Sequence, residues 1–87
     1  MNNYRLMNYQ VVQTWLETKG NVKCSNKSYS LVCRNNKLLS YGDVLAEQVN
    51  NKIIIYQHKE TQATLKHVNL LITECKHYNI PFSMFED

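Results

Sequence analysis

The chain has 87 residues, of which 44% are hydrophobic and 20% charged, and this composition is typical of one small folded domain. Its apolar runs are far shorter than the roughly 20 residues that cross a bilayer, and residues 1–9 contain no apolar signal region. Three cysteines without a Cys-x-x-Cys pair favour free thiols over disulfides or a zinc site. We therefore expect a single cytoplasmic domain over residues 1–87, with no membrane association, metal or cofactor.

The net charge of +3 is too small to require a nucleic-acid partner, but the charges are unevenly distributed. Between Thr18 and Gly42 there are five basic residues and no acidic one, whereas Glu86 and Asp87 end the chain. The five are Lys19, Lys23, Lys27, Arg34 and Lys37. One end of the fold is therefore expected to be locally basic.

The first predicted element is a helix within residues 4–19. Asn8 is the expected N-cap, and Gly20 suits a left-handed residue just past the end. Trp15 lies on the apolar stripe, and we expect it in the core rather than at a binding surface. The stripe has helical spacing, at Tyr9, Val12 and Leu16.

An antiparallel meander of three to four strands is predicted next. Residues 21–27 fit either a short edge strand or a loop, and residues 28–34 alternate as a half-buried strand does. Asn35-Asn36 and Asn50-Asn51 suit two-residue turns of type I′, because Asn tolerates positive φ. The run 38–49 is long for one strand, and Gly42-Asp43 is where we expect it to bend or bulge.

The second turn fixes which residues share a face. A tight Asn50-Asn51 turn pairs Val49 with Lys52 and Ala46 with Ile55. One face then carries only uncharged residues, and we expect a helix to cover it: Val44, Ala46, Ile53 and Ile55. The opposite face carries charges as well as apolar residues: Leu45, Glu47, Lys52, Ile54 and Tyr56.

A C-terminal helix over residues 64–78, packed on one sheet face, completes the predicted α+β fold. Thr61 is its expected cap, Asn79 its left-handed end residue, and Pro81 prevents continuation. The tail 82–87 is rich in apolar side chains and is expected to pack back onto the domain. The predicted core consists of Trp15, Leu31, Ile53, Ile55, Leu65, Val68 and Ile72.

The residues do not form a catalytic or metal-binding pattern. His67, Cys75 and His77 share a helix but have spacings of eight, two and ten, so they do not converge on one face. No Gly-rich elbow or carboxylate pair accompanies a nucleophile, so we expect no enzyme. His58 is interpreted as an exposed loop residue and His67 as either a structural hydrogen-bonding group or a site residue.

Basic residues interleaved with tyrosines make binding the better prediction. Lysine and arginine can contact phosphates while Tyr29 and Tyr41 stack on bases, although a solvated polar face explains the same pattern. The candidate binding residues are Tyr41, Lys23, Lys27, Tyr29, Arg34, Lys37 and His67.

Three segments resemble a small domain of unknown function that is common in bacteriophage genomes. They are Asn26-Lys27-Ser28-Tyr29, the run Leu38-Leu39-Ser40-Tyr41-Gly42-Asp43-Val44-Leu45-Ala46-Glu47, and Thr61-x-Ala63-Thr64-x-x-His67. The family pattern is Asn-x-Ser-aromatic, Leu-Tyr-Ser-Tyr-x-Thr-x-Ile-Ala and Ser-x-Thr-Thr-x-x-His. The chain departs from it at Leu39, Asp43, Thr61 and Ala63.

The resemblance implies a phage-encoded cytosolic protein and carries no established activity. Its Ser-Tyr and His positions fall on a strand and a helix start that can hydrogen-bond each other. Small phage proteins without catalytic residues often block host proteins, and the leading hypothesis is therefore a protein-binding inhibitor of a host system such as CRISPR or another anti-phage defence. The alternative is a nucleic-acid-binding phage regulatory protein. The sequence leaves the oligomeric state open.

Overall fold

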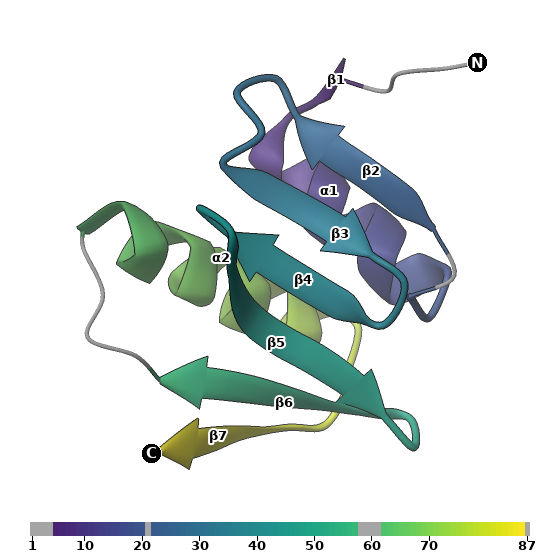
Figure 1. The fold of residues 1–87 in the computed structure, drawn as a ribbon. Coiled ribbons are helices and arrows are strands. Elements are labelled where there is room, and N and C mark those ends of the chain that lie inside the picture. The colour runs from purple at the N-terminus through teal and green to yellow at the C-terminus, as the bar shows by residue number, and fades with distance from the viewer. Residues whose placement is uncertain (1–4, 21, 58–61, 87) are drawn as a thin grey trace.

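The computed structural model describes residues 5–20, 22–57 and 62–86, and shows two helices and one mixed sheet of seven strands (Figure 1). The α+β class is as predicted, whereas three to four strands were too few. The elements in chain order are β1 (Arg5–Leu6), α1 (Asn8–Glu17), β2 (Lys23–Asn26), β3 (Leu31–Arg34), β4 (Lys37–Ser40), β5 (Asp43–Val49), β6 (Lys52–Gln57), α2 (Gln62–His77) and β7 (Phe82–Glu86).

The strands lie in the sheet in the order in which they occur in the chain. Strands β2 to β6 are antiparallel neighbours, but β1 pairs with β2, and β6 with β7, in parallel. Parallel neighbours need a crossover connection, and α1 and α2 provide one each. Both helices lie on the same face of the sheet, behind it in Figure 1. The tail packs back as predicted, and it does so as β7.

Helix α1 begins at Asn8, one residue earlier than the predicted Asn8 cap implied, and its N-cap residue differs from the prediction. Met7 is the N-cap residue, and its N–H donates to Gln10 Oε1 at 2.8 Å. Asn8 is the first helical residue, and its Oδ1 accepts a hydrogen bond from Asn26 Nδ2 at 2.7 Å, so the predicted Asn8 cap is wrong. The end is as predicted: Gly20 has φ +81°, and its N–H donates to the Trp15 carbonyl at 2.9 Å.

Three two-residue turns connect the central strands. Asn50 and Asn51 have φ values of 51° and 65°, which confirms the predicted type I′ turn and the pairing that follows from it. Asn35 has positive φ, but Asn36 does not, so the first Asn-Asn turn is not of type I′. The third turn, at Tyr41-Gly42, has positive φ at both residues and lies where only a bend or bulge was predicted.

A bulge in β5 changes which residues enter the core. Leu38 pairs with Ala46 and Leu39 pairs with Val44, so Leu45 is an extra residue between them. Leu45 is 1% exposed, whereas Val44 lies half-buried on the opposite face beside Leu39. The predicted faces are therefore wrong for these two residues, because a bulge reverses the alternation on one side of itself.

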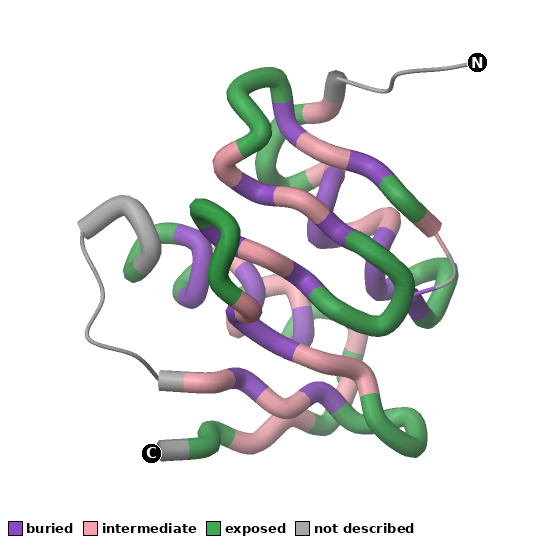
Figure 2. Tube along the Cα trace, in the orientation of Figure 1, coloured by how far each residue is buried: buried purple, intermediate pink, exposed green. Residues whose placement is uncertain are grey.

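The core lies between the sheet and the two helices, and Figure 2 shows buried positions alternating along the strands. Helix α2 ends as predicted: Asn79 has φ +57°, and the Ile80 N–H donates to the Cys75 carbonyl. Leu65 is 42% exposed and Ile72 half-buried, so neither belongs to the buried core that we predicted. The expected cap Thr61 and the loop residue His58 lie outside the described residues. The other predicted core residues are buried: Trp15, Leu31, Ile53, Ile55 and Val68.

Candidate functional site

A buried serine–histidine pair links the sheet to α2. Ser40 ends β4 and His67 lies in the second turn of α2; Ser40 Oγ and His67 Nδ1 share a hydrogen bond of 2.7 Å. Tyr41 follows in the turn and stacks on the imidazole, with ring centroids 5.7 Å apart and planes inclined by 19°. The strand-to-helix hydrogen bond that the sequence suggested is therefore present.

The burial of this pair determines what it can do. Ser40 is 2% and His67 4% exposed, while Tyr41 is 57% exposed above the imidazole. Burial disfavours the imidazolium and lowers the pKa of His67 below its ordinary value of 6.5. A serine and a neutral imidazole enclosed in this way anchor α2 to β4, but they do not present a nucleophile to a substrate.

The first and second family-like motifs meet beside this pair. Asn26 Oδ1 accepts the Leu31 N–H at 3.1 Å, and Asn26 Nδ2 donates to Ser30 Oγ at 2.8 Å as well as to the asparagine that opens α1. The Ser30 carbonyl in turn accepts the Tyr41 N–H at 2.8 Å. Tyr29, in the same loop, has φ +61° and is 61% exposed. Asn26 thus fixes the loop that lies against the Tyr41 turn.

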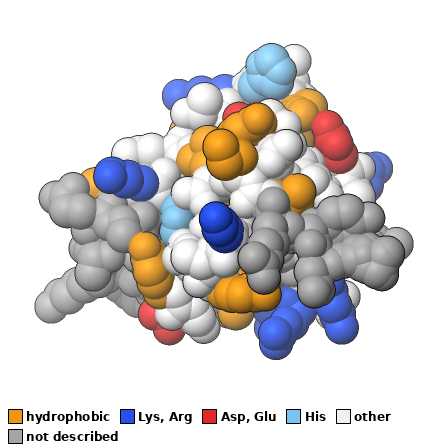
Figure 3. All heavy atoms as spheres, turned by 90° about the horizontal axis from the view of Figure 1, so that it is seen from above, with side chains coloured by type: hydrophobic (Ala, Val, Ile, Leu, Met, Phe, Trp, Pro, Cys, Tyr) orange, Lys and Arg blue, Asp and Glu red, His pale blue; other side chains and the backbone are white. Residues whose placement is uncertain are grey.

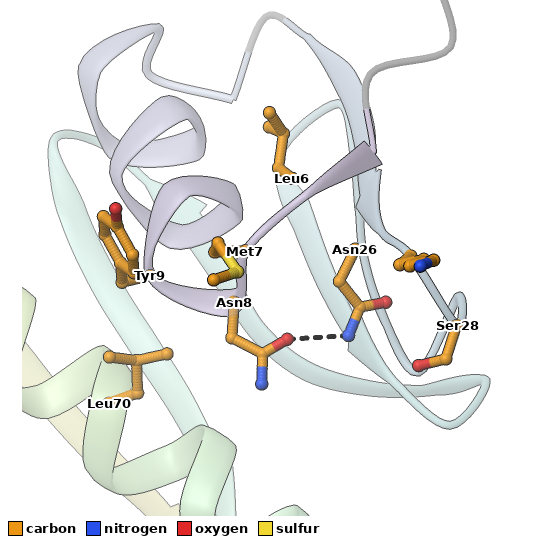
Figure 4. A pocket seen from close by; sticks show the side chains of 8 residues that line it. Leu6, Met7, Asn8, Tyr9, Asn26, Ser28 and Leu70 are labelled. Atoms are coloured by element: carbon orange, nitrogen blue, oxygen red, sulfur yellow. Dashed lines mark hydrogen bonds between the residues drawn. The ribbon is translucent and has the colours of Figure 1, made fainter.

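A cleft of about 750 Å³ opens between the start of α1, the β2–β3 loop and α2 (Figure 4). Leu6, Met7 and Leu70 form apolar parts of the cleft wall, and the exposed Lys27 lines the cleft from the β2–β3 loop. The buried polar group of this cleft, Asn26, already uses both its amide nitrogen and its carbonyl oxygen in hydrogen bonds. The cleft therefore lacks an unpartnered buried group that would select a ligand.

Three predicted basic residues form a row across three strands. Lys23 pairs with Arg34, and Arg34 with Lys37, so all three stand on the sheet face opposite the core. They are exposed, and neighbouring strands are roughly 4.8 Å apart, so the row spans about 10 Å. Figure 3, in which the molecule is turned to be seen from above, shows Lys and Arg side chains gathered at its lower margin. We call these three residues the basic row.

An apolar row runs parallel to the basic row, one pleat further along the strands. Val32 pairs with Leu39, and Leu39 with Val44; all three are half-buried although no helix lies on this face in the described part of the chain. They form what we call the apolar row. The uncovered face thus combines aliphatic surface with adjacent positive charge.

The far side of the same face is aromatic and acidic. Tyr56 and Phe85 pack edge to face, with ring centroids 5.5 Å apart and planes inclined by 79°. The Tyr56 hydroxyl donates to Glu47 Oε1, and Glu47 pairs with Lys37 across the strands. Glu47 thus separates the basic row from the two aromatic rings.

The structure brings the predicted site residues together in two groups rather than one. Tyr41 and His67 form the stacked pair, and the basic row holds three of the four predicted cations. Lys27 and Tyr29 lie in the β2–β3 loop, apart from that row. Sequence reasoning missed Asn26 and the apolar row. Alternation within residues 28–34 together with the Asn35-Asn36 turn contained the signal for Val32 pairing with Leu39.

Lowering the pH is expected to destabilise the fold through His67. Its pKa is lower when folded than when unfolded, so its contribution is complete above about pH 6.5 and declines as the pH falls toward the folded value. Chemical denaturation at pH 7.5 and at pH 5 measures the decrease in the free energy of unfolding between them. This decrease should be smaller in His67→Gln, because glutamine does not titrate. His77→Gln, at an exposed position of the same helix, is the matched control and leaves it unchanged. Equal pH dependence in wild type and His67→Gln contradicts the assignment.

Among the described residues, no group of three or more His, Cys, Asp or Glu side chains is placed to hold a metal ion. No helix in the described segments is long and apolar enough to cross a membrane. Neither protein-family models, nor curated proteins, nor solved structures gave a match to the chain.

Proposed function

We propose that this chain is a binding protein that inhibits a host protein, in keeping with the phage resemblance and an anti-defence role, and that it docks through the uncovered sheet face. The observation that carries the proposal is the basic row lying directly beside the apolar row. Aliphatic side chains on a rigid sheet supply area that becomes dehydrated on contact, and the adjacent cations select an acidic surface. The expected partner is therefore a protein with a negatively charged, partly apolar patch.

Two features favour a protein over a nucleic acid on this face. Base stacking needs open aromatic rings next to the cations that contact phosphates, but Tyr56 and Phe85 pack against each other at the other side of the face. Glu47 lies between them and the basic row and would repel a phosphate backbone. The residues next to the cations are aliphatic instead, which suits a protein surface.

Nucleic-acid binding is the second candidate, and the alignment of the basic row favours it. Three neighbouring cations can contact successive phosphates, and each neutralised phosphate contributes roughly 0.7 to 0.9 to the log–log salt slope. Anisotropy with mixed-sequence DNA and RNA at low salt tests this directly. No binding at tens of micromolar removes the candidate, because non-specific binders are expected at about 10⁻⁴ to 10⁻⁶ M even at physiological salt.

Charge reversal in the basic row is expected to weaken the protein interaction. Arg34→Glu, at the centre of the basic row, should lower the affinity for the host protein at least about tenfold, because an attractive contact becomes repulsive. The matched control is Lys66→Glu, which changes the net charge equally at an exposed position of α2, on the other layer. The measurement is quantitative pull-down from host lysate, followed by titration of the purified partner.

Phage plating on a host that carries the relevant defence provides the functional readout. Wild type and Lys66→Glu should restore plating, whereas Arg34→Glu should not. The absence of any stoichiometric protein partner, together with no rescue of phage under defence, would overturn the proposal. Loss of capture in both variants would show that net charge matters and the sheet face does not.

A further inference from the structure

Strand β7 is an edge strand, and its outer side pairs with no other strand among the described residues. It pairs only with β6 in the described part of the chain and forms the lower edge of the sheet in Figure 1. Ile53 pairs with Phe82, and the Ile53 N–H donates to the Pro81 carbonyl at 3.0 Å. In a parallel ladder this pattern turns the N–H and C=O of Phe82 away from β6, and alternation does the same for Met84 and Glu86.

This edge has few of the features that usually prevent strands from pairing, and its one charged residue is Glu86 at the end of the strand. It spans five residues and contains no proline, lysine or bulge between Phe82 and Glu86. Two of its apolar side chains are also uncovered, since Met84 is 37% and Phe85 50% exposed. An apolar strand edge with open hydrogen-bonding groups is a template for the addition of another strand.

We propose that a second copy of this chain occupies the edge, with the two β7 strands antiparallel across a twofold axis at Met84. A twofold contact requires a self-complementary patch, and the register centred on Met84 is the one that pairs all three outward-facing residues of β7. With Met84 opposite Met84 of the second copy, Phe82 lies opposite Glu86. Every outward N–H and C=O between these residues then has a partner, and no two acidic residues face each other.

The same register covers the exposed side chains. The two Met84 side chains meet on the helix side of the sheet, next to the buried Ile55 of β6, which pairs with Met84. Phe85 lies opposite Ser83 of the second copy on the uncovered face, at the closer spacing of a non-hydrogen-bonded pair. The sheet becomes continuous through both copies. This inference is independent of the host-protein proposal, because it uses the β7 edge and not the basic row.

Disulfide trapping tests the register. The chain with Met84→Cys should form a covalent dimer under mild oxidation, because hydrogen-bonded opposite residues have Cα atoms about 5.5 Å apart, within the range of disulfides. Ser83→Cys and Phe85→Cys are the matched controls and should not, since neither position faces itself across the axis. The native cysteines do not interfere, because all three are buried.

The oligomeric state of the untrapped protein gives the second measurement. Light scattering on the wild-type chain at about 100 µM should report twice the monomer mass of 10.3 kDa. Met84→Pro removes an outward N–H without touching the β6–β7 ladder, so it should give a folded monomer. If Met84→Pro fails to fold, Met84→Lys serves instead, since it sets like charges together at the axis. A monomeric wild type overturns the proposal, and so does a dimer that persists in these variants or cross-links equally through residues 83, 84 and 85.

Discussion

Replacing Trp15 with alanine is expected to lower the free energy of unfolding by about 3 to 5 kcal/mol, among the largest effects of any truncation in the described core. The side chain is fully buried, and its Nε1 donates to the Asn35 carbonyl at 3.0 Å. The Trp15 carbonyl also accepts a hydrogen bond from Gln48 Nε2 at 2.8 Å, so α1 is joined here to the β3–β4 turn and to strand β5. The total free energy of unfolding of a small domain is roughly 5 to 15 kcal/mol, so the variant should lose much of its stability and unfold on mild warming.

Urea denaturation followed by circular dichroism measures this change, and two further variants separate its causes. Trp15→Phe keeps most of the apolar area and removes the Nε1 hydrogen bond, so its cost should be intermediate. Tyr9→Ala truncates an aromatic residue of the same helix that is 46% exposed, and it should cost less than about 1 kcal/mol. Similar losses in Trp15→Ala and Tyr9→Ala would contradict the placement of α1.

Helical spacing and turn chemistry predicted the parts of the fold that depend on local sequence. The stripe that contains Trp15 indicated α1, and Asn50-Asn51 fixed the register of β5 and β6 because both residues accept positive φ. Asn79 ended α2 for the same reason. Each of these features involves residues within a few positions of one another, so the pattern contains the physical cause.

The edge strands and one face of α2 had no such local signal. β1 has two residues and pairs with β2 through a helical crossover, so nothing in its own sequence indicates a strand. β7 likewise depends on where α2 returns the chain. Leu65 has the right spacing for the core, but spacing defines only a stripe, and how far the sheet extends under the helix decides which of its members are covered.

The candidate site was half predictable. The family-like motifs drew attention to Tyr41 and His67, and the structure shows the contact between them. A tight Asn35-Asn36 turn predicts that Arg34 and Lys37 are neighbours. Lys23 lies beside them only because residues 23–26 form a strand, and the sequence fitted a loop there equally well. The apolar row required the bulge in β5, and a bulge depends on tertiary packing rather than on sequence period.

That bulge gives the second large prediction, because it reverses the roles of two adjacent residues. Leu45→Ala should lower the free energy of unfolding by about 2 to 5 kcal/mol, since the side chain is 1% exposed and its removal leaves a cavity under the helices. Val44→Ala removes less apolar surface from a half-buried position on the uncovered face, and it should cost less than about 1.5 kcal/mol. Both variants place an alanine in the same strand, so the difference between their free energies of unfolding reports burial of the original side chain rather than backbone preference.

Regular alternation through β5 predicts the opposite order. Without a bulge, Val44 shares the covered face with Ala46, and Leu45 lies in solvent with the charged residues, so Val44→Ala would be the costlier change. Thermal and urea unfolding of the two variants, measured side by side, therefore decides between the two registers. The binding readout gives an independent check, because Val44 belongs to the apolar row. Val44→Ala should lower the affinity for the host protein while leaving the fold intact. Leu45→Ala should affect binding only to the extent that it unfolds the chain.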